Sequence, residues 1–361
     1  MRTNGYLKGT DKNNPDDKPF CSVLNTSKLG LALDVKNPKA KEVITRFYEW
    51  ADIVFENFAP GKLEKMGFGY EFAKTINPNL IMAHCSIYGR TGPNAPLSGT
   101  DGMGSSAGCH RGLTGWPDRE PMPFSPMVLG DVMMPATAVG AMVAALEYRN
   151  RTGKGVEIDV SMLDILSMKA SPMVMNYVAN GMVEQRNGNH SQYACPHFTY
   201  QTAGEDRWIA IAAYNDEDWL LLRKALGEPE WAQDPEFLTF EGRKANEDFI
   251  DARIAEYTAD KLAEDLMNEL QGRGIAAAVV QNQRDLQEND PLLYERGYYV
   301  DLPQFDQGVI KHMRPPFLFE NINHSMSAAP ALGQHTYKVC TEYAGMSDEE
   351  FVSYDEAGLF K

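Results

Sequence analysis

The stretch PMVLGDVMMPATAVGAMVAAL, from Pro126 to Leu146, constrains the fold more than any other part of the chain. It carries a single charged residue, Asp131, and the residues that follow are apolar, small or helix-forming. We expect such a segment to form a buried helix, in which an unpaired carboxylate costs several kcal/mol. Asp131 therefore serves as a helix cap, as half of a buried ion pair, or as a group held for chemistry.

Short apolar segments alternate with amphipathic segments on both sides of this helix. The apolar segments are predicted to be strands and the amphipathic segments are predicted to be helices. The strands are 29–35, 52–58, 80–89 and 155–162, and the helices are 38–51, 69–76 and 163–181. This alternation predicts an α/β fold with a Rossmann-like, mostly parallel sheet. Residues 92–126 are rich in Gly, Pro and Ser, and we expect a functional loop there.

The sequence changes character near Arg186. Two alternating runs around a GED turn predict a hairpin over 198–214, followed by helices at 217–226 and 246–271 and a strand at 274–281. These elements predict a second, smaller α+β domain. We therefore divide the chain into a large domain over 1–185, a small domain over 186–310, and a return to the large domain over 311–361.

Composition limits the possible partners and compartments. The formal net charge is −16 and lysines and arginines form no long cluster, which argues against a nucleic-acid partner. The five cysteines are scattered without a CxxC pair, as expected for reduced thiols in a cytoplasmic protein. With neither a signal peptide nor an uninterrupted apolar run of about 18 residues, we expect no membrane association.

The histidines give no sign of a metal site. His84 is predicted in a strand, and His110, His190 and His197 are predicted in loops. None is spaced i, i+4 from another ligand-type residue, so we expect no bound metal.

Asp131 has two compatible interpretations. Asp is a frequent N-cap residue, and Pro135 favours the first helical turn, so the helix is predicted to begin after Asp131, at Met133 or Met134. The helix dipole would then keep the Asp131 carboxylate ionised beside an apolar wall, which suits a nucleophile.

Several stretches together resemble the family III CoA-transferases, the CaiB/BaiF group. They are LNTSKLGLALDVKNPKAKEV, ADIVFENFAPGKLEKMGFGYE, INPNLI, YGRTGP, the LGD that precedes a small-residue helix, ALEYRNRTGKG, IDVSMLD, RNGN and CPHFTYQTAGEDRWIAIA. They follow the family order from near residue 20 to about residue 300.

The resemblance implies an acyl-CoA:carboxylate CoA-transferase with Asp131 as the nucleophile. The expected partners are an acyl-CoA and a small carboxylic acid, with CoA thioester as substrate, no tightly bound cofactor, and an aspartyl anhydride and an aspartyl-CoA thioester as intermediates. Related α-methylacyl-CoA racemases carry a GHD stretch, where this chain has GTD with Thr100 in the histidine position. Because threonine is a poor base near neutral pH, we favour the transferase over a racemase or isomerase.

The resemblance also implies a CoA-binding site and an interlocked dimer. The implied CoA-binding residues are Leu33, Asp34, Val35, Lys36, Asn57, Phe58, Ala59, Lys65, Leu97, Ser98, Gly99 and Thr100. The family opens with a strand, glycine loop, helix and strand that have no counterpart here, so we expect this βαβ piece to be truncated or supplied by another polypeptide. A homodimer, a hetero-oligomer with a related subunit, and a non-catalytic subunit all remain open.

Overall fold

The computed structural model describes residues 13–16, 18–122, 129–305, 307–322 and 325–360. The chain forms two compact units, each assembled from non-contiguous segments. The first unit contains Met1–Arg111, Pro123–Val183 and Leu292–Lys361, and the second contains Gly112–Met122 and Glu184–Pro291. Unit 2 therefore includes the short segment Gly112–Met122 and ends at Pro291. The small domain expected from the sequence covers 186–310 instead.

Unit 1 contains a three-stranded parallel sheet in the order β1-β2-β3. The strands are β1 (Ile53–Glu56), β2 (Ile81–Ser86) and β3 (Val156–Ser161), each within a predicted strand. The central strand β2 is buried from Ile81 through Cys85, as is typical of a parallel strand covered on both faces.

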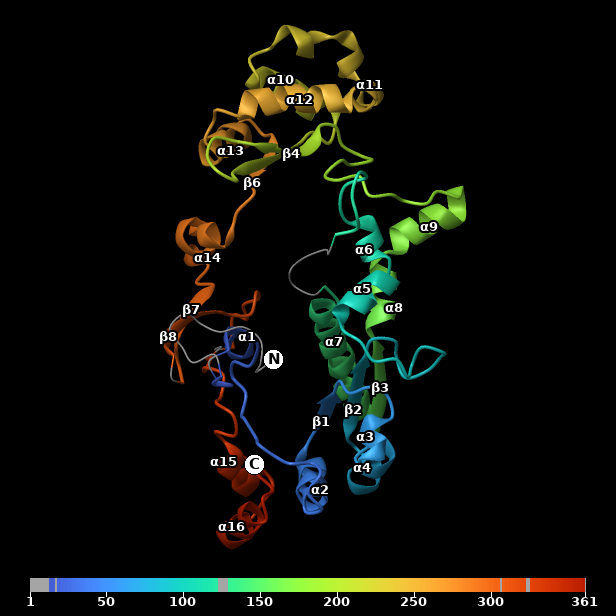
Figure 1. Cartoon of the computed structure of the whole chain (residues 1–361), viewed down its shortest axis with the longest axis vertical. Helices are drawn as coiled ribbons and strands as arrows, with labels where there is room; N and C mark the ends of the chain where they lie inside the picture. The colour runs from blue at the N-terminus through green and yellow to red at the C-terminus, as the bar shows by residue number, and fades with distance from the viewer. Residues whose placement is uncertain (1–12, 17, 123–128, 306, 323–324, 361) are drawn as a thin grey trace. The chain divides into compact units, whose positions relative to one another are not determined.

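Helices cover both faces of this sheet (Figure 1). Met82 packs among residues of α2 (Ala40–Trp50) and α4 (Tyr70–Ile76), whereas Cys85 packs among residues of α7 (Leu129–Thr152) and α8 (Met162–Lys169). Side chains alternate between the faces of a strand, so β2 presents even-numbered residues to α2 and α4 and odd-numbered residues to α7 and α8. The short helix α3 (Lys62–Lys65) follows β1, and α9 (Ser171–Asn180) follows α8.

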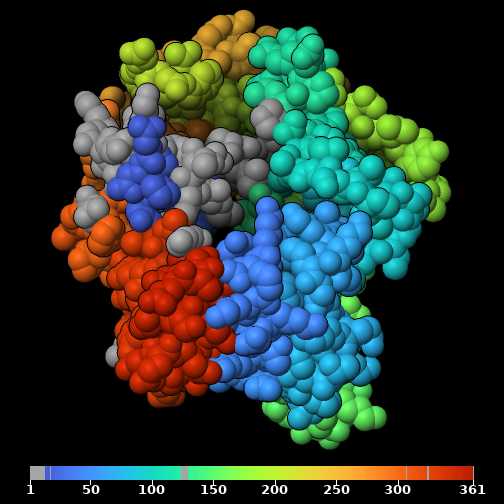
Figure 2. Space-filling view, turned by 60° about the horizontal axis from the view of Figure 1, so that its bottom comes forward, coloured from blue at the N-terminus to red at the C-terminus, as the bar shows by residue number. Residues whose placement is uncertain are grey.

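The predicted strand at 29–35 is absent, because side chains and the C-terminal segment take up its backbone donors. Gly30 N–H donates to His335 Nδ1, Ala32 N–H donates to Thr336 Oγ1, and Asp34 N–H donates to the carbonyl of Leu359. Figure 2 shows the C-terminal segment (red) lying against the early part of the chain (blue), where Arg46 also pairs with Glu350 at 2.9 Å.

Residues 92–126 contain helices where we expected a loop. α5 (Asp101–Ala107) and α6 (His110–Leu113) lie here, so His110 is helical. The GTDGMGSSAG stretch is helical because its glycines allow close packing: a Cβ atom on Gly104 would lie 2.7 Å from the Met162 sulfur. Tertiary contact thus outweighs the low helix propensity of glycine.

Within the described ranges, α7 is the one helix long and apolar enough to cross a membrane by length and composition. Core helices of soluble proteins meet the same criterion. Here α7 packs against β2, β3, α5 and α8, while Val132, Val139 and Val143 on its surface are more than half exposed.

Unit 2 contains an antiparallel sheet of β4 (His197–Gln201), β5 (Trp208–Ala212) and β6 (Ala276–Val279). His197, expected in a loop, therefore opens a strand. Its helices are α10 (Asp216–Ala225), α11 (Phe240–Ala245), α12 (Glu247–Thr258) and α13 (Ala263–Gly272), with 3-10 turns at Glu230–Gln233 and Pro235–Leu238. Trp219 is fully buried at the centre, beside the equally buried Arg243, whose guanidinium donates to two carbonyls and to Asp216.

The remaining elements of unit 1 come from the two ends of the chain. α1 (Pro19–Leu24) lies near the start, and β7 (Tyr299–Gln304) and β8 (Gly308–Met313) form a hairpin near the end. In unit 2, Asp285–Asn289 is π-helical, and α14 (Pro291–Glu295) carries the chain from unit 2 into unit 1. The C-terminal elements are α15 (Thr336–Lys338), a π-helical turn at Val339–Tyr343, and α16 (Asp348–Glu356).

Candidate active site

Asp131 lies inside α7, not ahead of it. The helix already includes Leu129, so Asp131 belongs to its first turn and Pro135 lies further along the helix. The predicted start at Met133 or Met134 is therefore wrong, and Asp131 is no N-cap. Pro135 lies inside the helix and has no N–H to donate to the carbonyl of Asp131, so this carbonyl lacks its usual helical hydrogen bond.

A second carboxylate, that of Asp101, anchors the start of α7. Asp101 is buried in the first turn of α5, where its Oδ1 accepts the N–H of Gly130 and its Oδ2 accepts the hydroxyl of Ser105 at 2.9 Å. A Cβ atom on Gly130 would lie 2.6 Å from Asp101 Oδ1 and would also meet the sulfur of Met162. The glycine of the LGD stretch is therefore required for the approach that places Asp131 next to Asp101.

The electrostatic surroundings of Asp131 oppose its ionisation. Partial burial raises the pKa of the Asp131 carboxyl, and the negative charge of Asp101 raises it further. A carboxylate with a raised pKa is a stronger base and a better nucleophile once it is ionised.

Asp131 opens into a cavity of about 280 Å³ in unit 1. Seven of the predicted CoA-binding residues line the same cavity: Asn57, Phe58, Ala59, Leu97, Ser98, Gly99 and Thr100. The first three follow the carboxyl end of β1 and the other four precede α5. Cys85, Ser86 and Ile87 at the end of β2 complete one side, and Met134 and Met162 provide apolar wall. Ligands commonly bind at this edge of a parallel sheet.

The other predicted CoA-binding residues lie away from this cavity. Leu33 and Val35 line a larger, almost wholly apolar groove of about 790 Å³, which Phe58 borders as well. Asp34 accepts the N–H of Lys36 at 3.0 Å in an exposed turn. Lys65, at the end of α3, is also exposed.

Several residues at or near the site were not predicted from the sequence. Lys62 lies with its Nζ 5.1 Å from the centre of the Phe58 ring, so a third lysine is near the predicted CoA-binding residues. Met134 and Met162 were undetected because methionine in an apolar helix is ordinarily a core residue. The GTD stretch pointed to Asp101 by its position beside Thr100, but the hydrogen bond to Gly130 has no local sequence signal.

Comparison with known proteins identifies the family. The family described as CoA-transferase family III matches residues 2–336. The chain belongs to this family. It is 30% identical to a succinyl-CoA–D-citramalate CoA-transferase of Chloroflexus aurantiacus, over 91% of this chain and 81% of that protein. It is 28% identical to a succinyl-CoA–L-malate CoA-transferase beta subunit of the same organism, over 90% and 80% of the two chains.

A solved structure confirms the mixed α/β fold of the family. The crystal structure of a CAIB/BAIF family protein from Brucella suis is similar to this chain with a TM-score of 0.83 and 31% identity. The similarity covers 94% of this chain and 86% of that one. The family resemblance seen in the sequence is thus confirmed, and its relatives support CoA-transferase activity that uses CoA thioester substrates.

Proposed function

We propose that this chain transfers CoA from an acyl-CoA to a free carboxylic acid through a covalent intermediate on Asp131. The observation that carries the proposal is the opening of the Asp131 carboxylate into the cavity lined by seven predicted CoA-binding residues. This geometry allows a bound thioester to meet a nucleophile without a metal or ATP, since the energy of the thioester is conserved throughout.

The exchange proceeds in four balanced steps. The Asp131 carboxylate attacks the thioester carbonyl and expels CoA thiolate, which leaves a mixed anhydride. The thiolate then attacks the Asp131 carbonyl and releases the donor acid, giving an aspartyl-CoA thioester. The acceptor carboxylate displaces CoA thiolate to form a second anhydride, and the thiolate attacks the acceptor carbonyl and frees Asp131.

Residues around Asp131 are suited to position these steps. Asp101 fixes the start of α7 by accepting the Gly130 N–H. We propose that backbone N–H groups near the start of the helix stabilise the oxyanions of acyl transfer. Lys36 and Lys65 are proposed to bind CoA phosphates, and Phe58 to pack on the adenine or pantetheine.

CoA exchange is tested with succinyl-CoA and a panel of free acids that includes citramalate and malate. We expect double-displacement kinetics and formation of the acceptor's CoA thioester. An inert chain that becomes active only with a related subunit would instead indicate a non-catalytic partner, an alternative kept open by the beta subunit among the relatives.

A racemase is the competing reaction within the family, and the cavity argues against it. Thr100 lines the cavity, and the described residues around it include no histidine that could pair with Asp131. Racemisation needs an acid and a base on opposite faces of the α-carbon. Incubation of an α-branched acyl-CoA in D₂O tests this alternative, and rapid deuterium uptake that depends on Asp131 would establish the racemase.

We also propose that the chain self-associates or pairs with a related subunit. Exposed apolar residues on α7 and α9 support this: Val132, Val139 and Val143, and Val174, Met175 and Val178. Exposed apolar surface on this scale is typical of protein interfaces. Light scattering on the purified chain is expected to give the mass of a dimer. The five free cysteines are compatible with a reducing, cytoplasmic location, which stays a prediction.

A further inference from the structure

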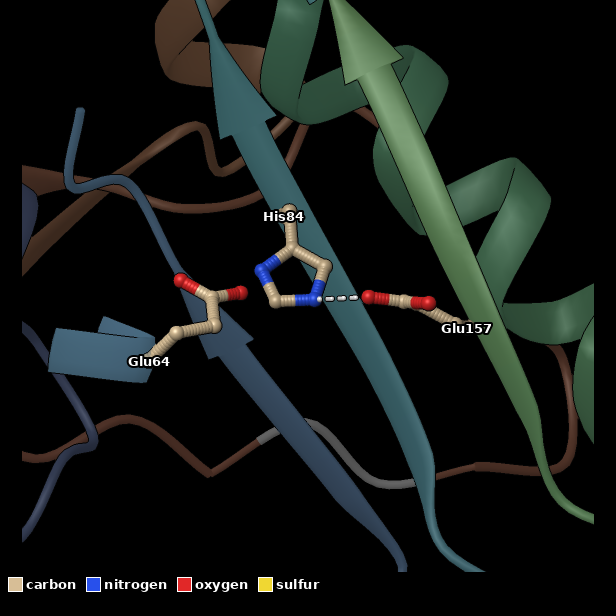
Figure 3. Close-up of side chains that lie close together, drawn as sticks. All are labelled: Glu64, His84 and Glu157. Atoms are coloured by element: carbon tan, nitrogen blue, oxygen red, sulfur yellow. Dashed lines mark ion pairs between the residues drawn. The ribbon is translucent and has the colours of Figure 1, made fainter. Parts of the chain in front are cut away.

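A second group of carboxylates surrounds His84 on the α4 face of the sheet. His84 leaves β2 on the same face as Met82, and the residue is 1% exposed. Glu56 on β1, Glu157 on β3 and Glu64 on α3 reach toward its ring. Figure 3 shows Glu64 and Glu157 approaching the His84 imidazole from two elements that are far apart in sequence.

The two nitrogens of His84 have different surroundings. Nδ1 lies 2.5 Å from Glu56 Oε1, so Nδ1 carries a hydrogen and donates it to this buried carboxylate. Nε2 is buried without a hydrogen bond of acceptable geometry, although it lies 3.0 Å from Glu157 Oε1. In the neutral ring the Nε2 lone pair would face a carboxylate oxygen, which is repulsive unless a cation lies between them.

Glu64 supplies a third possible ligand atom, and Figure 3 draws it on the opposite side of the imidazole from Glu157. One atom each of Glu64, His84 and Glu157 lies within 4.8 Å of the others, close enough for a single ion after a small adjustment. A metal-binding imidazole characteristically donates its other N–H to a carboxylate, as His84 does to Glu56. Imidazole nitrogen with two carboxylates is a ligand set of zinc and related divalent metals. We propose that Glu64, His84 and Glu157 bind a divalent transition metal ion, with Zn²⁺ as the matching ion.

Arg90 is the competing cation. Its guanidinium donates to Glu64, and its Nη2 lies 3.7 Å from Glu157. Three carboxylates, those of Glu56, Glu64 and Glu157, surround the histidine with this single arginine, so the site attracts a dication. The ion has to share Glu64 with Arg90 or displace it, and removal of the guanidinium therefore strengthens metal binding.

The ion would hold the sheet together next to the cavity of Asp131. Its ligands come from β2, β3 and α3, and Glu56 on β1 supports His84. Asn57 and Ser86, which line the cavity, follow Glu56 and His84 closely in the chain. The metal has no part in the transfer reaction, so this proposal goes beyond the proposed function.

Zinc binding to the purified chain, without acyl-CoA, tests the site. The background variant is Cys109→Ser, because Cys109 is the exposed cysteine among the described residues and would compete for zinc. Titration against a chromogenic chelator is expected to show one zinc ion per chain and a rise in melting temperature with zinc. His84→Gln is expected to abolish this binding, and Glu56→Gln to weaken it by about 10- to 100-fold through loss of the support to His84.

Arg90→Gln distinguishes a metal site from a purely structural ion-pair network. A metal site predicts tighter zinc binding in this variant, whereas an ion-pair network predicts only lower stability. Absorption spectra with Co²⁺ should show nitrogen and oxygen ligation without the thiolate charge-transfer band.

His190 provides a matched control. Its Nδ1 is 3.6 Å from Glu247 and its Nε2 is 2.9 Å from Asp251, so its two acidic neighbours face different nitrogens and share no ion. His190→Gln should leave zinc affinity unchanged. Equal zinc affinity in the background variant and in His84→Gln, or no affinity in either, overturns the proposal and leaves a proton on Nε2. Should His84→Gln fail to fold, Glu157→Gln serves in its place, and unchanged zinc affinity in that variant overturns the proposal as well.

Discussion

Two groups of acidic residues lie on opposite sides of β2, and the pKa values of their carboxyl groups are shifted in opposite directions. On the α7 face, Asp131 lies near Asp101 in a cavity whose described lining contains no lysine, arginine or histidine, and its pKa is raised. On the α4 face, burial opposes ionisation of Glu64, yet the hydrogen bond and charge of Arg90 bring the pKa of Glu64 below its usual value. The same carboxyl group thus has a raised pKa on one face and a lowered pKa on the other, according to whether a cation is within reach.

Removal of the Asp131 carboxylate should abolish most of the transfer activity. Asp131→Asn keeps the shape of the side chain but cannot form the anhydride, so transfer should fall by at least about 1,000-fold. Asp164→Asn is the matched control, because Asp164 is also the third residue of a helix, α8, and its substitution should leave transfer intact. Near wild-type transfer by Asp131→Asn would exclude Asp131 as the nucleophile.

The same variant should also be more stable at neutral pH. A carboxyl with a raised pKa in the folded state contributes stability only while it is protonated, and this contribution is lost as the pH rises through the folded-state pKa. The neutral amide of the Asp131→Asn variant avoids that loss. Melting temperatures are expected to differ most at neutral pH and to converge in acid, and a lower melting temperature for Asp131→Asn at pH 7 would contradict the electrostatic description.

Substitution of the exposed lysines should affect substrate binding more than turnover. Lys36→Ala and Lys65→Ala remove contacts to phosphates that are made equally in the ground and transition states, so KM for acyl-CoA should rise about 10-fold with little change in kcat. Lys154→Ala, in the turn after α7, is an exposed control that should change neither constant. An unchanged KM in both site variants would place the CoA phosphates elsewhere, with Lys62 as the next residue to test.

Neutralising Asp101 should change the pH dependence of the reaction. Asp101→Asn retains an oxygen that can accept the Gly130 N–H but removes the negative charge that raises the pKa of Asp131. The acid limb of the kcat/KM profile should therefore move to lower pH. A shift to higher pH, or none, would show that Asp101 does not act on Asp131 through its charge.

The sequence predicts the parallel sheet well because its strands are short apolar or alternating runs between turn signals, although only β2 is buried along most of its length. It fails at 29–35, where Leu29, Leu31, Leu33 and Val35 do alternate but face an apolar groove rather than a neighbouring strand. Helix α5 was not predicted because the low helix propensity of glycine gives no information about the close contact between Gly104 and Met162. The sequence misplaces the start of α7 because the preference of proline for the first turn is weaker than the packing of Gly130 on Asp101.

The sequence predicts only part of the candidate site, because some of its contacts depend on how separate strands align. Local sequence signatures mark Asp131 and the stretches Asn57–Ala59 and Leu97–Thr100. Each could therefore be predicted on its own, without knowing that all of them line one cavity. The contacts of His84 arise from the register of β1, β2 and β3, which aligns Glu56 with His84 across parallel strands. A search for ligand residues spaced i, i+4 along one helix cannot find such a group.

The position of the covalent intermediate decides whether Asp131 is the nucleophile. The chain is incubated with succinyl-CoA without an acceptor acid, quenched, digested and mapped by tandem mass spectrometry. We predict a CoA adduct on Asp131, its loss in Asp131→Asn, and its persistence in Asp101→Asn. An adduct on Asp101, or rapid transfer with no adduct on either residue, would contradict the assignment of Asp131 as the nucleophile.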